Sequence, residues 1–137
     1  MRYESGTADD GTAEVRAAFV PKADEIGWPT LFHSGLHFLV LYEVSYWTAL
    51  TLGGKVWVSV GPATYSSDRL PRVGVSHIAR ARILRSEPTF LSIRATTEVV
   101  GGKPCGSLES TWRPARRAAI ERAHIPIPDY LLSEIDP

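Results

Sequence analysis

The chain has no asparagine and no glutamine, and it has one cysteine and one methionine in 137 residues. Without amide side chains, the protein has no Asn or Gln to orient a water molecule or hold an oxyanion. The single cysteine, Cys105, excludes an internal disulfide bond and leaves no thiolate metal site. The scarcity of thermolabile residues is typical of heat-adapted proteins (a thermophile), and a GC-rich genome, which also favours Arg over Lys, explains it equally well.

The chain also lacks an excess of charge, because 15 basic residues balance 15 acidic ones. A nucleic-acid binder held by bulk electrostatics needs a basic excess to displace counterions, so this class is disfavoured. The first residues contain no apolar run of the kind found in signal peptides, which predicts a cytoplasmic protein. We expect one domain over residues 1–137, with residues 1–11 as a flexible lead-in and residues 114–137 as a tail that carries a short helix.

The dominant feature is the apolar stretch at residues 36–52, which ends at a Gly-Gly pair at residues 53–54. It predicts a long helix, capped by Ser34 or Thr30, that is apolar on almost every face and therefore buried on most sides. A membrane span is disfavoured, because the stretch barely reaches the length that a bilayer requires and carries the charged Glu43 near its centre.

After this stretch, the hydrophobic period changes from helical to two. The pattern predicts one strand before the helix and four after it, at residues 12–20, 55–65, 73–85, 90–100 and 104–113. Short turns join the last three strands, so these should be neighbours in an antiparallel sheet, and we expect all four strands after the helix to form a meander in chain order. The expected fold class is α+β, with one long buried helix wrapped by a curved antiparallel sheet. The outer face of this sheet should carry Arg80, Arg82, Arg94 and Glu98.

Glu43 is the most conspicuous candidate for chemistry. It is the only formally charged residue between Gly35 and Gly54, and Tyr46 and Trp47 lie one turn after it. A carboxylate in such surroundings is costly to ionise unless it is paired, and carboxylates of this kind often serve as general acids or bases. The sequence therefore favours a catalytic Glu43 over two alternatives, a place on a wet stripe of the helix or a pair with an arginine of the sheet.

Other reactive side chains match no established pattern of chemistry. His33 and His37 are four residues apart, as in some zinc sites, but no third ligand accompanies them, so no metal site is expected. Cys105 has no basic neighbour that would activate it, and Ser59 lies in no G-x-S-x-G turn. The chain has neither a P-loop nor a G-x-G-x-x-G motif, so no cofactor is expected.

The order of these features resembles the hotdog-fold thioesterase superfamily, and in particular the branch typified by phenylacetyl-CoA thioesterase. The resemblance rests on His33-Ser34-Gly35 before a buried helix with one acid, on the Gly-Gly pair after it, and on the segment VSVGPATYSSD at residues 58–68 followed by three strands. It extends over about residues 12–113 and implies a hotdog fold and hydrolysis of an acyl-CoA thioester.

The resemblance also implies roles for single residues. In the family, a glycine amide at the start of the helix polarises the thioester carbonyl, and an acid on the helix attacks it or activates water. Gly35 and Glu43 match these positions if Ser34 stands where the family has histidine; if His33 is aligned there instead, the acid falls one residue late. Ser59 resembles a strand serine that orients the water in some members.

The family forms its sites between two subunits, which implies a homodimer or a dimer of dimers with acyl-CoA as its substrate. The catalytic residues implied are Glu43, Gly35, Ser59 and His33, and the substrate-binding residues are Ser34, His37, Tyr65, Arg69 and Arg82. The two arginines are candidates for the phosphates of coenzyme A.

Two other functions stay open on the same fold. One is hydration or dehydration of an enoyl-CoA, in which His33, His37 or His77 would act together with an acid. The other is a module that binds acyl-CoA or lipid without turnover. The aromatic residues of the helix either line a pocket for a long or aromatic acyl group or form the core, so the acyl group is left open.

Overall fold

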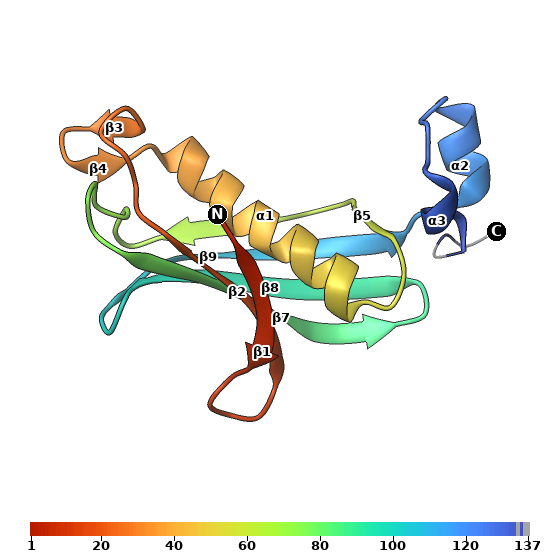
Figure 1. The fold of residues 1–137 in the computed structure, drawn as a ribbon, viewed down its shortest axis with the longest axis horizontal. Coiled ribbons are helices and arrows are strands. Elements are labelled where there is room, and N and C mark those ends of the chain that lie inside the picture. Colours follow the sequence, from red (N-terminus) through yellow and green to blue (C-terminus); the bar gives the residue numbers. More distant parts are fainter. Residues whose placement is uncertain (134, 136–137) are drawn as a thin grey trace.

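A computed structural model describes residues 1–133 and residue 135 of the chain. The helices are α1 (Ser34–Leu52), α2 (Arg117–Arg122) and α3 (Asp129–Leu132). The strands are β1 (Tyr3–Thr7), β2 (Ala13–Phe19), β3 (Ile26–Trp28), β4 (Leu31–Phe32), β5 (Trp57–Ser59), β6 (Thr64–Ser67), β7 (His77–Glu87), β8 (Phe90–Val99) and β9 (Pro104–Pro114). Figure 1 shows α1 lying across one face of a curved antiparallel sheet, which is the predicted architecture.

The sheet has the order β1-β2-β7-β8-β9-β5, and β6 also pairs with β9. Strands β7, β8 and β9 form the meander that their short turns predicted. The expected place of the strand at residues 55–65, beside β7, was wrong. This segment forms β5 and β6, which both pair with β9 at the far edge of the sheet. The single strand expected at residues 55–65 is divided in two, since Gly61, with a φ of 80°, and Pro62 interrupt the pairing.

Helix α1 is buried on one side and open on the other. Its buried side packs on the sheet through Leu41, Val44 and Ala49, which are at most 1% exposed. On its open stripe, Leu39 is 47% exposed and Tyr46 is 39% exposed. The expected burial therefore holds for the sheet side of the helix, while the open stripe leaves apolar surface uncovered in a single chain.

The N-terminal residues are not the flexible lead-in that the sequence suggested. Tyr3–Thr7 forms β1, which pairs with β2 and makes one edge of the sheet. The Tyr3 ring stacks on Trp47 with 5.4 Å between the ring centroids, so the edge strand is anchored on α1.

The C-terminal tail carries α2 and α3, which Figure 1 shows standing apart from the sheet. The expected short basic helix is present as α2. It begins at Arg117, after β9, whose last residue Pro114 is paired with Trp57.

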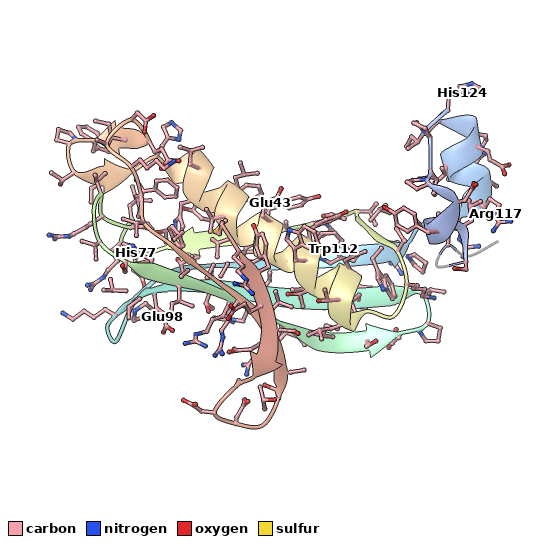
Figure 2. All side chains as sticks on the ribbon, in the orientation of Figure 1. Glu43, His77, Glu98, Trp112, Arg117 and His124 are labelled. Carbon is pink, nitrogen blue, oxygen red and sulfur yellow. The ribbon has the colours of Figure 1, made fainter. Side chains whose placement is uncertain are left out.

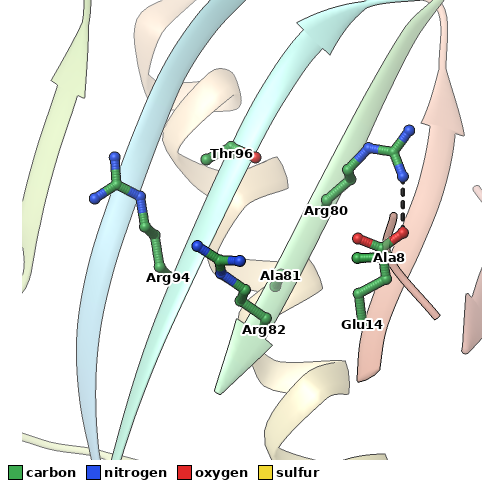
Figure 3. Close-up of a pocket in the computed structure, with 7 residues that line it drawn as sticks. All are labelled: Ala8, Glu14, Arg80, Ala81, Arg82, Arg94 and Thr96. Carbon is green, nitrogen blue, oxygen red and sulfur yellow. Dashed lines mark hydrogen bonds and ion pairs between the residues drawn. The ribbon is translucent and has the colours of Figure 1, made fainter. Parts of the chain in front are cut away.

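The outer face of the sheet carries Arg80, Arg82 and Arg94, as predicted, and Figure 3 shows Arg80 paired with Glu14. Arg80 lies between two carboxylates, with Nη1 2.7 Å from Glu14 Oε1 and Nε 2.8 Å from Glu98 Oε1. The side chain of Glu14 is only 6% exposed, so this pairing offsets the cost of burying its charge. Arg82 on the same face binds Asp10 with an N–O distance of 3.0 Å.

Candidate functional site

The N-terminus of α1 is capped by a histidine. His33 has extended backbone geometry, and its Nδ1 accepts a hydrogen bond of 3.0 Å from the Gly35 amide. The expected cap, Ser34 or Thr30, was therefore wrong. Ser34 is the first residue of the helix, and Thr30 lies in the turn between β3 and β4 with a φ of 67°. Gly27 lies beside the imidazole, since an added Cβ there would be 3.4 Å from His33 Cδ2, so the β3–β4 hairpin borders one side of the exposed ring.

This cap decides which donors the helix start offers. The Gly35 amide, the proposed oxyanion donor, is engaged by His33. Within the described chain, the amides of Ser34 and Leu36 donate to no protein acceptor. These amides lie at the positive end of the helix dipole, and they are available to donate to an oxygen atom of a ligand.

Glu43 lies in the third turn of α1 and is half-buried (Figure 2). In the part of the chain that the structure describes, it forms no hydrogen bond and no ion pair, so the alternative of a pair with a sheet arginine is wrong. It faces β1, where its charge adds to the effect of burial in raising the pKa of Tyr3. The carboxylate is thus neither neutralised by a cation nor fully in water.

Two cavities lie along the seam between α1 and the β1–β2 pair. One, of about 360 Å³, includes Phe19, Phe32 and Val40 in its lining. The other, of about 320 Å³, is lined by Tyr3, Ser5, Val15, Trp47 and Thr51. Val40 precedes Glu43 by one helical turn and Trp47 follows it by one, so Glu43 lies between the two cavities without lining either.

Ser59 lies on the other flank of α1. It is opposite Trp112 in the β5–β9 pairing, and the Trp112 ring stacks on Tyr42 with 5.7 Å between centroids. Glu43, by contrast, faces β1. A single chain therefore does not bring Ser59 and Glu43 together.

The two arginines predicted to bind substrate are also apart. Arg69 is exposed in the loop after β6, where its amide donates to the Cys105 carbonyl over 3.3 Å. Arg82 is on the outer face of the sheet, paired with Asp10. Arg82 and the N-terminus of α1 thus lie on opposite faces of the sheet.

His37 and Tyr65 are brought together, under the first turn of α1. His37 is fully buried, with Nδ1 2.9 Å from Tyr65 Oη and Nε2 2.6 Å from Thr97 Oγ1. Burial, and then the charge of nearby His77, lower the pKa of His37 to about 4. Burial raises the pKa of Tyr65, and the neighbouring Ser67 hydroxyl opposes this rise.

The sequence analysis did not identify Thr97, which is hydrogen-bonded to His37 and so forms a group of three with His37 and Tyr65. The available signal was its inward position in the alternating pattern of β8, where a hydroxyl needs a buried partner. Gly106 is also part of the arrangement, because an added Cβ there would lie 2.7 Å from His37 Cε1 and 2.7 Å from the Ser66 carbonyl oxygen.

The histidines considered for hydratase chemistry differ in access. His37 has both ring nitrogens engaged, and His77, also fully buried, has Nδ1 2.7 Å from the Val75 carbonyl and Nε2 3.4 Å from the Arg72 amide. His33 is exposed, with its Nε2 open. Of the three, His33 alone can reach a substrate in this structure.

The described residues contain no cluster of His, Cys, Asp or Glu that can hold a metal ion. Among the same residues, no helix has the length and apolar character needed to cross a bilayer.

The helix laid on a curved antiparallel sheet defines a protein of the hotdog class, and known structures support this. A Streptococcus mutans protein solved with bound acetyl-CoA superposes with a TM-score of 0.70 at 11% identity, covering 82% of this chain and 88% of that one. A Streptococcus pneumoniae hypothetical thioesterase solved with coenzyme A gives a TM-score of 0.69 at 13% identity, covering 82% and 87%.

The Escherichia coli PaaI protein from the phenylacetic acid degradation operon is also similar, with a TM-score of 0.66 at 15% identity over 81% of this chain and 78% of that one. No protein-family model matches the sequence. No curated protein matches it either. The expected hotdog fold is therefore confirmed, and at these identities the likeness concerns the fold.

Proposed function

We propose that the protein hydrolyses acyl-CoA thioesters, with Glu43 as general base or nucleophile. The observation that carries the proposal is the half-buried Glu43 carboxylate, which has no cationic partner among the described residues and lies between two cavities. An unneutralised carboxylate in such a place is available to accept a proton from water or to attack a carbonyl carbon. The choice of substrate class is supported by two proteins with the same fold, a hypothetical thioesterase solved with coenzyme A and a protein solved with acetyl-CoA.

The hydrolytic step needs a base and an oxyanion site. Glu43 takes a proton from water, the resulting hydroxide adds to the thioester carbon, and the carbonyl oxygen acquires a negative charge. Backbone donors at a helix N-terminus stabilise that charge. The donor proposed here is the Gly35 amide, released when its His33 cap rotates away, with the Leu36 amide beside it. Collapse of the adduct breaks the carbon–sulfur bond and leaves the carboxylic acid, and the departing thiolate of coenzyme A takes up the proton held by Glu43.

The length of α1 supports a site that is built from two copies of the chain. At a rise of about 1.5 Å per residue, Gly35 and Glu43 are about 12 Å apart along the helix axis, too far to contact one thioester group. Ser59 is likewise on the flank opposite Glu43. We therefore propose a homodimer, or a dimer of dimers, in which Gly35 of one copy meets Glu43 of the other. The open apolar stripe of α1 supports such an assembly.

The remaining predicted residues take supporting roles in this proposal. Ser34 is exposed beside the helix start and can contact the ligand, and Arg69 is exposed near the same end of the sheet, where it can bind a coenzyme A phosphate. Arg82 is left out, because it faces the other side of the sheet.

The test is release of coenzyme A from a panel of acyl-CoAs, followed with a thiol reagent. We expect Glu43→Gln to lower kcat by at least about 100-fold, the usual contribution of a general base. The exposed Glu121, on α2, provides the matched control, since Glu121→Gln changes the same group away from the site. Absence of coenzyme A release with every acyl-CoA would refute the proposal.

The two-copy site has its own test. Gly35→Pro removes the proposed donor at a position in the first helical turn, where proline is tolerated. Gly35→Pro and Glu43→Gln should each be inactive alone, whereas a co-expressed mixed dimer should regain activity through its one intact site. A mixed dimer as inactive as its parents would show that both residues act within one chain.

A further inference from the structure

A directed chain of hydrogen bonds lies under the first turn of α1. It runs from Thr97 on β8 through the ring of His37 to the phenol of Tyr65 on β6, over 2.6 Å and 2.9 Å. Thr97 and His37 are both 0% exposed, while Tyr65 is half-exposed. The buried Thr97 can therefore determine which way the hydroxyl proton of the accessible Tyr65 points.

His37 transmits a direction because its ring is neutral. Burial disfavours the imidazolium, and the pKa near 4 keeps the ring uncharged at neutral pH. A neutral imidazole has one donor nitrogen and one acceptor nitrogen. The two hydrogen bonds of His37 must therefore point in the same sense along the chain.

Thr97 selects that sense. In the described part of the chain, its Oγ1 has His37 Nε2 as its one hydrogen-bond partner. If Thr97 accepted a proton from Nε2, its own buried hydroxyl proton would have no acceptor, which is costly. Thr97 therefore donates to Nε2, the ring proton resides on Nδ1, and Nδ1 donates to Tyr65 Oη.

The phenol proton of Tyr65 is consequently turned away from His37. The hydroxyl of neighbouring Ser67 has a single proton, which lies between the carbonyl oxygens of Cys105 and Arg69, each 3.0 Å from Ser67 Oγ, so it is not needed by Tyr65. The Tyr65 ring packs edge-on against Phe38 in the second turn of α1, with centroids 5.9 Å apart, which fixes its position. The phenol is thus a placed donor with an accessible face.

We propose that Tyr65 donates a hydrogen bond to a carbonyl oxygen of the bound acyl-CoA, either of the thioester or of a pantetheine amide, and that His37 and Thr97 are positioning residues that orient this donor. The inference rests on the proposed function. It also changes the role of His37, which has no free nitrogen and no exposed surface with which to bind substrate itself.

The direction of the chain is measured without any substrate. In a ¹⁵N-histidine-labelled sample, long-range ¹H–¹⁵N spectra should show His37 with a protonated Nδ1 and an unprotonated Nε2. A protonated Nε2 would overturn the inference whether or not the protein is an enzyme.

The ligand contact is measured with Tyr65→Phe, which keeps the ring against Phe38 and removes the hydroxyl. For acetyl-CoA, kcat/KM should fall about threefold to tenfold, the effect of one neutral hydrogen bond. An equal rise in the Kd of free coenzyme A, by calorimetry, would assign the acceptor to a pantetheine amide; an unchanged Kd would assign it to the thioester. Unchanged kcat/KM and Kd would refute the contact while leaving hydrolysis intact.

The positioning role is measured by a double-mutant cycle. Thr97→Val is nearly isosteric and should lower kcat/KM in the wild-type background but not further in Tyr65→Phe, because Thr97 acts through the phenol. Thr97→Ser keeps the hydroxyl and should restore activity. Equal losses in both backgrounds would mean that Thr97 only supports the fold. If no acyl-CoA is bound or hydrolysed by any form, the proposed function and the Tyr65 contact are both wrong, while the spectrum still reports the direction of the chain.

Discussion

The imidazole of His33 accepts a hydrogen bond of 3.0 Å from the Gly35 amide, so the residue that caps α1 also occupies the donor proposed for catalysis. Stability of the free helix and access of a ligand to its N-terminus are therefore linked. A ligand oxygen that displaces the ring replaces one acceptor by another, and the helix end does not lose its cap.

Replacing His33 tests the cap directly. We expect His33→Ala to lower the free energy of unfolding by about 0.5–2 kcal/mol, the usual effect of losing an N-cap. His33→Asn should recover most of this loss, because an Asn side chain is a strong acceptor at the same position. Urea denaturation of the three proteins measures the difference. Equal stability of His33→Ala and wild type would mean that the hydrogen bond contributes nothing to folding.

Gly106 should be intolerant of a side chain. A Cβ at this position would lie 2.7 Å from His37 Cε1 and 2.7 Å from the backbone oxygen of Ser66, and the oxygen cannot move without shifting β6. We expect Gly106→Ala to cost about 1–3 kcal/mol of stability, as for other overpacked sites. Gly6 in β1 is the control, since its nearest contact would be the flexible end of Arg16 at 3.7 Å. Gly6→Ala should change the denaturation midpoint little, and an equal shift for both variants would contradict the steric account.

Local sequence signals predicted most of the fold. The apolar stretch and its Gly-Gly end located α1, and the period of two located β7, β8 and β9. The position of β5 and β6 was missed, because turn length fixes neighbours only for strands that are joined by short turns. Strand β1 was missed because its polar, glycine-containing residues carry no alternating pattern and are held by pairing and by the stacking of Tyr3 on Trp47.

The sequence identified single candidate residues of the site, but not the hydrogen bonds that join them in the folded protein. Glu43 was recognised from its isolation on an apolar helix, a property that the sequence alone contains. The contact between His37 and Tyr65 joins residues 28 apart, and that between His37 and Thr97 joins residues 60 apart. Such contacts depend on the order of strands, which local patterns do not specify.

The pH dependence of stability should reflect His37. Its pKa is about 4 in the folded protein against 6.5 ordinarily, and burial also lowers that of His77. Between these pH values the unfolded state binds more protons, so stability rises with pH in this range. The contribution is fully present above about pH 6.5 and is lost as the pH falls towards 4, with a magnitude of about 3 kcal/mol for His37.

Unfolding by urea at several pH values between 4 and 7 measures this effect. His37→Asn removes the titrating ring and should flatten the dependence relative to wild type. His124→Asn is the matched control, because His124 is exposed and its φ of 54° suits asparagine. An unchanged slope in His37→Asn would mean that carboxylates alone cause the loss of stability in acid.

Strand β1 should be anchored on α1 by the ring of Tyr3, which stacks on Trp47 with 5.4 Å between the ring centroids. Tyr3→Ala removes the stack and should lower the free energy of unfolding by about 0.5–1.5 kcal/mol. Tyr3→Phe keeps the stack and removes only the hydroxyl, so it is the matched control and should be as stable as wild type. Urea denaturation of the three proteins measures the difference. An equal loss of stability in both variants would show that the hydroxyl, and not the stacked ring, anchors the strand.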